Sequence, residues 1–374
     1  IAGFFVLYKL ITFRMFDIGG DAINYWFAAK HIYYGLAYPE LTHQTSRFGI
    51  IFPAALSQFL LGVHPVVTAV LPNILMFLQM IFIYKIGVRL HSIHAGFISA
   101  MLFILCPYVI RWSGQILPPA FEGPALTMSF YFLLNYGENA KRTLMHLLFS
   151  ALMLFWAYTV KETDIYFMPA FIAVMFMMRK NYKHIIFYSA FLFILFLMEC
   201  ALYHHFTGDF LGRLHSITGH HLDGEKLVPV SFLKLFSRYT GSELLWRIPF
   251  FIYLALLVPV FKNGNVKIKG LALSGIVFYV LIMFSVKSIN PIVPALPFKE
   301  QYLMTGLTFM IPVIAIGSIT LYNYLRGRFR VPGESGNPVP GIKHYIITIL
   351  FFSLVGLSVT GTGILPKKAD PYYN

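Results

Sequence analysis

Long apolar runs separated by short polar stretches define the pattern of this chain. About eleven runs approach the ~20 apolar residues that a helix needs to cross a bilayer core about 30 Å thick. They lie at 1–13, 65–84, 92–108, 123–136, 143–160, 163–178, 184–203, 246–262, 269–287, 301–325 and 343–361. The pattern predicts an all-α polytopic membrane protein that forms one domain over residues 1–374. Because the chain opens at Ile1, inside an apolar run and without a methionine, we expect further sequence before it.

The apolar stretch 48–62 is treated separately, because it is short and contains a proline. Counting it as a span would move the basic stretches 84–94 and 179–184 to opposite sides of the membrane. We therefore predict a short helix there, started by its proline and lying in the membrane interface.

Composition agrees with a membrane protein. Hydrophobic residues make up 58% of the chain, charged residues only 12%, and the mean hydropathy is +0.70. One soluble core cannot bury that much apolar surface, so the predicted partner of most of the surface is the lipid bilayer.

The net charge of +14 follows from topology. Lysine and arginine gather in the short loops 84–94, 137–142, 179–183, 262–269 and 326–343. Of the 15 acidic residues, only Glu138 and Glu334 fall on that side. This bias predicts that these loops are cytoplasmic, and it removes the reason to expect a nucleic-acid partner. The expected location is the inner membrane of a bacterium, with the active site facing outward.

Two long outer segments, 14–64 and 204–245, carry acids, bases, aromatics and histidines. Loops of that length in a compact protein are usually functional, although a solvated cap is the alternative. The first contains Asp17 and Asp21 around a glycine pair. Helical spacing after Asp21 places Tyr25 on the same face, and Asp21 stands where a helix N-cap is expected. Capping accounts for one aspartate, not for two.

The order of motifs in and after this segment resembles the type-C membrane glycosyltransferases, of the protein O-mannosyltransferase and aminoarabinose transferase kind. The sequence contains "GD-x-x-x-Y-x-x-A", then "G-x-x-Y", then "R-x-G-x-x-x-P", and a first full span ending in "YKIGVRL". Later matches are "PYVIRWSGQILPPAFEGPALTMSFYFLL" (107–134), "KET" (161–163), "FTGDFLGRL" (206–214) and "PFKEQYLMTGLTFMIP" (297–312).

The resemblance implies transfer of a sugar from a polyprenyl-phosphate donor to an acceptor hydroxyl at the outer face, with inversion at the anomeric carbon. The acceptor would be a glycan, a lipid or a protein. By this resemblance, Asp21 corresponds to the aspartate that acts as general base in the family. Ala22 follows it where many relatives have an acid, so Asp17 is assigned as the second catalytic carboxylate.

The leaving lipid phosphate needs cations. Arg47, Lys299 and Lys161 are the candidates, on their positions in the matched motifs. Arg47 could instead reach lipid headgroups. Lys161 could form a structural ion pair with its neighbour Glu162.

Sugar or acceptor contacts are assigned to polar residues at the predicted outer ends of the spans. They are Tyr25, Gln115, Glu122, Glu162 and Tyr302. No metal site is assigned, because the pairs His204–His205 and His220–His221 lack a carboxylate at zinc spacing. A divalent metal stays open as the only cofactor considered.

Other classes of protein fit less well. A secondary transporter would show repeated halves and polar residues at the membrane midplane, whereas the polar residues here gather at one face. Another lipid-phosphate-dependent transferase, such as an acyltransferase, leaves the motif order unexplained. An oligosaccharyltransferase is expected to carry a "WWD" motif in a sizeable soluble domain, and the long outer segments contain neither.

Overall fold

The computed structural model describes most of the chain between residues 20 and 328. The described ranges are 20–106, 109, 115–136, 142–178, 181–223, 231, 233, 244–283, 286–289, 292–294 and 301–328. The first and last predicted spans, 1–13 and 343–361, lie outside them.

Helices account for nearly all of the described elements. In chain order they are α2 (Asp21–Tyr33), α3 (Phe48–Leu61), α4 (Pro65–Leu90), α5 (Ile93–Leu105), α7 (Pro118–Asn135), α8 (Thr143–Val160), the 3-10 turn η2 (Glu162–Tyr166), α9 (Phe167–Met177), α10 (Tyr182–Thr207), α11 (Gly212–Asp223), α13 (Leu244–Asn263), α14 (Val266–Met283), the strands β1 (Val286–Ile289) and β2 (Ile292–Pro294), and α15 (Gln301–Arg328).

Four described helices have the length and composition to cross a membrane. The qualifying segments are Val70–Leu90, Thr143–Val160, Tyr182–Thr207 and Thr305–Tyr324. Shorter apolar helices lie at Phe48–Leu61, Ile93–Leu105 and Phe250–Lys262. The all-α polytopic fold class is confirmed, while the number of spans stays a prediction. The predicted span 269–287 ends earlier than expected, because its last residues belong to an antiparallel hairpin of β1 and β2 rich in β-branched residues.

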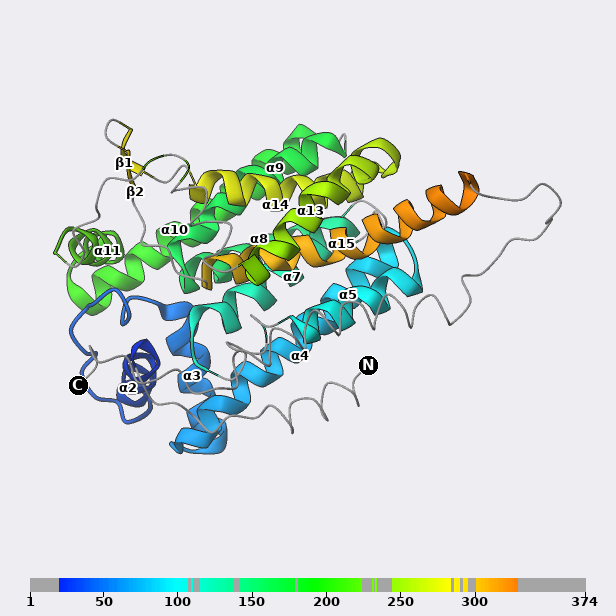
Figure 1. The fold of residues 1–374 in the computed structure, drawn as a ribbon. Coiled ribbons are helices and arrows are strands. Elements are labelled where there is room, and N and C mark those ends of the chain that lie inside the picture. The colour runs from blue at the N-terminus through cyan, green and yellow to red at the C-terminus, as the bar shows by residue number, and fades with distance from the viewer. Residues whose placement is uncertain are drawn as a thin grey trace.

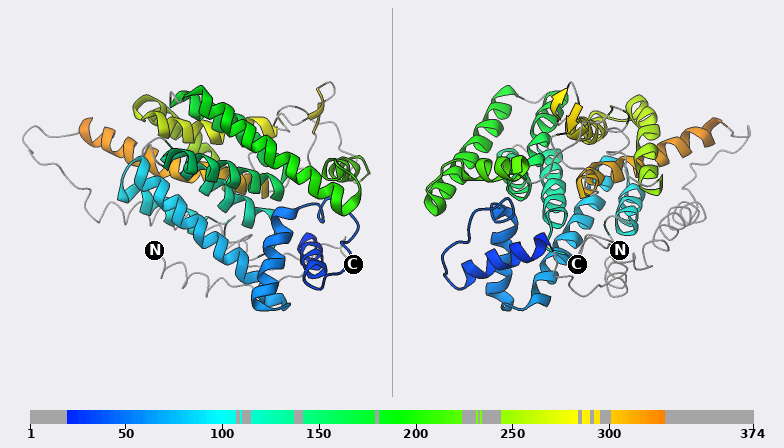
Figure 2. Two further views of the ribbon diagram at one scale, coloured as in Figure 1. Left: turned by 180° about the vertical axis from the view of Figure 1, so that it is seen from behind. Right: turned by 60° about the vertical axis from the view of Figure 1, so that its left-hand side comes forward.

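The long helices form a bundle. Within it α7 packs against α4 and α8, and α15 packs against α5, α7, α13 and α14. Figure 1 shows α2 and α3 together at one end of this bundle, and both views in Figure 2 keep them there. The turns that join α4 to α5 and α13 to α14 lie at the opposite end (Figure 1).

Two hydrophobic clusters hold the molecule together. The larger runs through the helix bundle and includes Phe130, Phe167 and Phe309. The smaller joins α2 and α3 to the adjoining ends of α4, α7 and α8, with Tyr25 and Phe121 buried in it. Polar side chains that lie between the two clusters are consequently fixed by packing on both sides.

Helix α3 begins earlier than the sequence suggested. It starts at Phe48, and Pro53 lies inside it rather than at its first turn. A proline has no N–H to donate to the carbonyl four residues before it, which here belongs to Gly49. The indole Nε1 of Trp156 donates to that oxygen at 2.9 Å instead. A bond from α8 thus satisfies the carbonyl and lets the helix continue through the proline.

Candidate active site

Asp21 stands at the first position of α2 but does not cap it. The N-cap residue is Gly20, which has a φ of 59° and supplies no side-chain cap. The expectation that Asp21 caps the helix is therefore wrong. Its Oδ1 instead accepts a hydrogen bond of 3.1 Å from Nε2 of Gln44, in the loop before α3. The carboxylate keeps acceptor positions beyond this one bond.

Tyr25 lies one turn further along α2 and is completely buried. Its hydroxyl accepts a hydrogen bond of 2.7 Å from Nη1 of Arg47. Burial raises the pKa of Tyr25 to about 12, against the opposing effect of the Arg47 guanidinium. The tyrosine is therefore a neutral partner that fixes the arginine. Ala28 and Ala29, about one turn further along the same face of α2, are buried with Tyr25.

The second nitrogen of the Arg47 fork faces the turn between α8 and α9. Nη2 lies 3.7 Å from Oε2 of Glu162. Burial alone would raise the pKa of Glu162, but the guanidinium groups of Arg47 and Arg213 outweigh burial and hold the pKa below its usual value. Arg47 thus joins the first outer segment to η2.

Lys161 contacts a different carboxylate from the one expected. Its Nζ lies 3.6 Å from Oε1 of Glu122, and both side chains are buried. The backbone of Lys161 is extended, with φ −151° and ψ 127°, so the side chains of Lys161 and Glu162 point to opposite sides. The pair predicted between these neighbours is replaced by two pairs that connect separate elements. Thr305 of α15 also donates to Oε1 of Glu122.

Sequence reasoning did not single out Arg213, at the start of α11. Its Nη1 donates to Oε1 of Glu199 at 2.6 Å, and its Nη2 donates to the carbonyl of Tyr158 at 2.5 Å. The guanidinium also lies over the Tyr158 ring, 4.5 Å from its centre. The sequence signals were its place in the matched stretch "FTGDFLGRL" and an acid inside the apolar segment 184–203, because such an acid needs a cationic partner.

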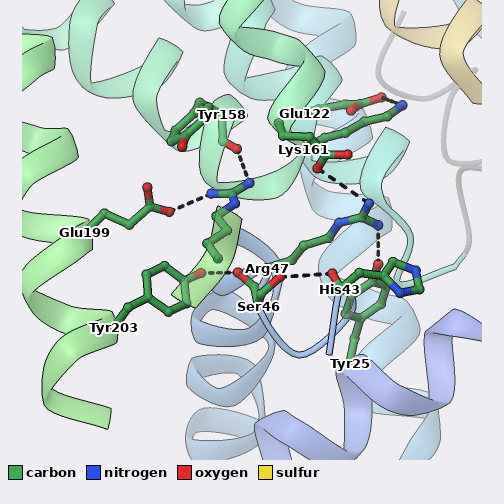
Figure 3. Close-up of polar contacts among 11 residues, drawn as sticks. Tyr25, His43, Ser46, Arg47, Glu122, Tyr158, Lys161, Glu199 and Tyr203 are labelled. Atoms are coloured by element: carbon green, nitrogen blue, oxygen red, sulfur yellow. Dashed lines mark hydrogen bonds and ion pairs between the residues drawn. The ribbon is translucent and has the colours of Figure 1, made fainter. Parts of the chain in front are cut away.

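Figure 3 shows how the C-terminal end of α10 supports the loop that carries Arg47. The hydroxyl of Tyr203 donates to the carbonyl of Ser46, the residue before Arg47. The Tyr203 ring stacks on Phe48 with centres 4.5 Å apart. On the other side of the loop, the Tyr38 hydroxyl donates to the carbonyl of Thr45 at 2.6 Å. The tyrosine of the "G-x-x-Y" motif therefore braces the loop.

The remaining predicted site residues are placed only in part. Gln115 is half-buried and precedes α7. Tyr302 belongs to the first turn of α15, but its side chain is not among those described. Asp17 and Lys299 lie outside the described residues, so the structure does not test their roles.

A metal site does not emerge from the described part of the chain. No group of three or more histidine, cysteine, aspartate or glutamate side chains in it is arranged to hold an ion. Among the described residues, the charged network includes three ion pairs: Arg47–Glu162, Lys161–Glu122 and Arg213–Glu199.

Part of this chain matches the model of a known protein family. Residues 48–204 match the family model described as dolichyl-phosphate-mannose-protein mannosyltransferase. That range includes Glu122, the turn η2 and Glu199. No curated protein matches the sequence as a whole or in part.

Solved structures agree with the family match. The chain superposes on ArnT from Cupriavidus metallidurans bound to undecaprenyl phosphate with a TM-score of 0.62 and 11% identity, over 95% of this chain and 70% of that one. It has the type-C glycosyltransferase fold. The resemblance read from the sequence motifs is thereby confirmed.

The same fold extends to a more distant class of enzyme. The oligosaccharyltransferase of Archaeoglobus fulgidus in the apo form aligns with a TM-score of 0.58 and 10% identity, over 95% of this chain and 54% of that one. The archaeal oligosaccharyltransferase AglB from the same organism, in complex with an inhibitory peptide and a dolichol-phosphate, aligns with a TM-score of 0.53. At these identities the likeness concerns the fold alone.

Proposed function

We propose that this protein transfers a sugar from a polyprenyl-phosphate carrier to an acceptor hydroxyl at the outer face of a bacterial inner membrane. The family match over residues 48–204 and the type-C fold together support a membrane glycosyltransferase with a donor of this kind. The single observation that carries the proposal is the meeting of Asp21, Tyr25 and Arg47 where the first outer segment packs on the matched region.

The chemistry assigned to Asp21 is general-base catalysis. The acceptor oxygen attacks the anomeric carbon, and the bond from that carbon to the phosphate oxygen breaks. The polyprenyl phosphate leaves with the bonding electrons, while the acceptor proton passes to the carboxylate of Asp21. Attack opposite the leaving group inverts the anomeric carbon. Asp17 is proposed as the second carboxylate of the reaction.

Arg47 is proposed to bind the phosphate of the donor. Its planar fork can present two parallel N–H groups to phosphate oxygens and stabilise the charge that develops on the leaving group. Lys299 is proposed as a second cation. Lys161 is buried against Glu122, and we therefore propose that its charge acts on the phosphate from a distance.

Sugar or acceptor contacts are proposed for Gln115 and Tyr302. They are also proposed for Tyr25, but this residue is completely buried and bonded to Arg47, so it would reach a substrate only after the packing around it opens. The two carboxylates assigned to the same role, Glu122 and Glu162, belong to ion pairs in this structure. Glu122 has no exposed surface, so it would reach a sugar only after its contacts with Lys161 and Thr305 open.

The experiment that tests the proposal is a turnover assay. The purified chain is incubated with a panel of polyprenyl-phosphate sugars, and release of polyprenyl phosphate is measured. We expect turnover of at least one donor and its loss in Asp21→Asn. Absence of transfer and of hydrolysis across the panel would contradict the proposed function.

A further inference from the structure

The three ion pairs of the site differ in how accessible they are. Lys161 and Glu122 are 4% and 0% exposed, and Arg213 and Glu199 are 3% and 5% exposed. Arg47 and Glu162 are 12% and 20% exposed. An anion that arrives from outside therefore meets the Arg47–Glu162 pair before either of the others.

The Arg47–Glu162 pair is also the loosest of the three. Its nitrogen and oxygen are 3.7 Å apart, beyond hydrogen-bond distance, as are those of Lys161 and Glu122 at 3.6 Å, whereas the corresponding atoms of Arg213 and Glu199 are 2.6 Å apart. The Arg47–Glu162 pair is therefore both accessible and without a direct hydrogen bond. Oε2 of Glu162 accepts no hydrogen bond from the described residues. Separation of the pair would consequently break no hydrogen bond to this oxygen.

Glu162 has other cations to hold it after Arg47 turns away. Arg213 and Lys161 pair with other carboxylates but lie near enough to lower the pKa of Glu162, as Arg47 does. Tyr25 keeps its hydrogen bond to Nη1, so the arginine stays anchored while Nη2 changes partner. The arrangement therefore allows exchange of one anion for another at Nη2.

We propose that Glu162 is a built-in competitor that occupies Arg47 until the phosphate of the lipid donor displaces it. This inference rests on the proposed function and adds a regulatory role within its phosphate site. The donor phosphate is a diester of the sugar and the polyprenol, with one charge and two unesterified oxygens that match the two N–H groups of the fork, so it displaces Glu162 when it binds. The product is a phosphate monoester, which carries more charge than Glu162 and a third free oxygen. When the product lipid phosphate leaves, Glu162 returns and helps to release it.

The test measures binding of undecaprenyl phosphate to the purified chain in detergent. Glu162→Gln removes the competing charge and keeps the size of the side chain. We expect it to bind about two- to fivefold more tightly, the range for loss of a partly exposed ion-pair competitor. In turnover, the KM for the donor should fall without a rise in kcat, because product release becomes slower.

Three controls separate this effect from others. Asp209→Asn removes the same charge from an exposed pair with His215 and should leave binding unchanged. In an Arg47→Gln background, Glu162→Gln should give no gain, because the competition acts through Arg47. Glu162→Asp keeps the charge but shortens its reach, and it should bind with intermediate affinity. Thermal unfolding of each variant checks that it is folded.

The outcomes also separate this inference from the proposed function. Binding by wild type with equal or weaker binding by Glu162→Gln would overturn the competitor role alone. Equal gains in Asp209→Asn and Glu162→Gln would assign the effect to net surface charge and overturn it as well. Failure of wild type and every variant to bind would overturn the donor class and the inference with it.

Discussion

Asp21 is the residue on which the proposed chemistry depends. It is half-buried at the start of α2 and accepts one hydrogen bond, from Gln44. The carboxylate is held in one direction by Gln44 and can still accept a proton from a substrate hydroxyl. A side chain held in this way can act as a base only if its charge is retained.

We expect Asp21→Asn to lose transfer by about 10²- to 10⁴-fold, the usual contribution of a general base. Folding should be little changed, because an asparagine can still accept from Gln44. Asp17→Asn should be the milder of the two. Rates are measured with the donor identified in the panel. Glu40→Gln is the matched control, because it removes an exposed acid of the same segment, and near-normal turnover by Asp21→Asn would reject the assignment.

A second prediction at the residue scale concerns the guanidinium of Arg47. Its two terminal nitrogens have different partners, Tyr25 and Glu162. Arg47→Lys keeps the charge but cannot reproduce a fork, so donor binding should weaken about tenfold to a hundredfold. Binding of undecaprenyl phosphate measures the change. Unchanged affinity would instead support the alternative that Arg47 contacts lipid headgroups.

At the scale of elements, the contact between α3 and the end of α8 sets the position of Arg47. Gly49 allows the close approach: a Cβ on it would lie 2.5 Å from Oγ1 of Thr159 and 2.7 Å from the backbone nitrogen of Val160. Backbone atoms cannot move aside as a side chain can. The glycine of the "R-x-G-x-x-x-P" motif is therefore required by packing.

Gly49→Ala should separate α3 from α8 and destabilise the protein by about 1–3 kcal/mol, the usual cost of overpacking. Because Arg47 directly precedes α3, donor binding should weaken as well. Thermal unfolding and binding of the same preparation measure both effects. Leu60→Ala on the exposed face of α3 is the control and should alter neither. A stable Gly49→Ala with normal binding would contradict the role of this contact.

At the scale of the whole molecule, charge and shape give the same orientation. The candidate site lies at the α2–α3 end of the bundle, and the turns from α4 to α5 and from α13 to α14 lie at the other end (Figure 1). The helix ends beside those turns carry Arg89, Lys262 and Lys267, in loops that the sequence assigns to the cytoplasm. The site is accordingly predicted to face outward.

Cysteine labelling in intact cells tests this orientation. Both native cysteines, Cys106 and Cys200, are buried, which keeps background labelling low. Asn265→Cys, in the turn before α14, should react only with a membrane-permeant reagent. His205→Cys, at the exposed outer end of α10, should react with an impermeant one. Labelling of both positions by the impermeant reagent would contradict the topology and the location of the site.

The sequence by itself predicted most of the apolar helices, because hydropathy and charge act locally along the chain. The predicted segment 143–160 has the same bounds as the observed helix α8. The order of the motifs predicted the fold that the solved structures share. The sequence also selected Tyr25, Arg47, Glu122, Lys161 and Glu162, which the structure brings into one charged network.

Only the tertiary structure decided which charges pair. Lys161 and Glu162 are neighbours in sequence, yet an extended backbone at Lys161 sends their side chains to different partners. Arg213 entered the network because α11 folds back on α8 and α10, a contact that no local pattern encodes. An ion pair between distant segments depends on how helices pack, and packing is settled by the shapes of many side chains at once.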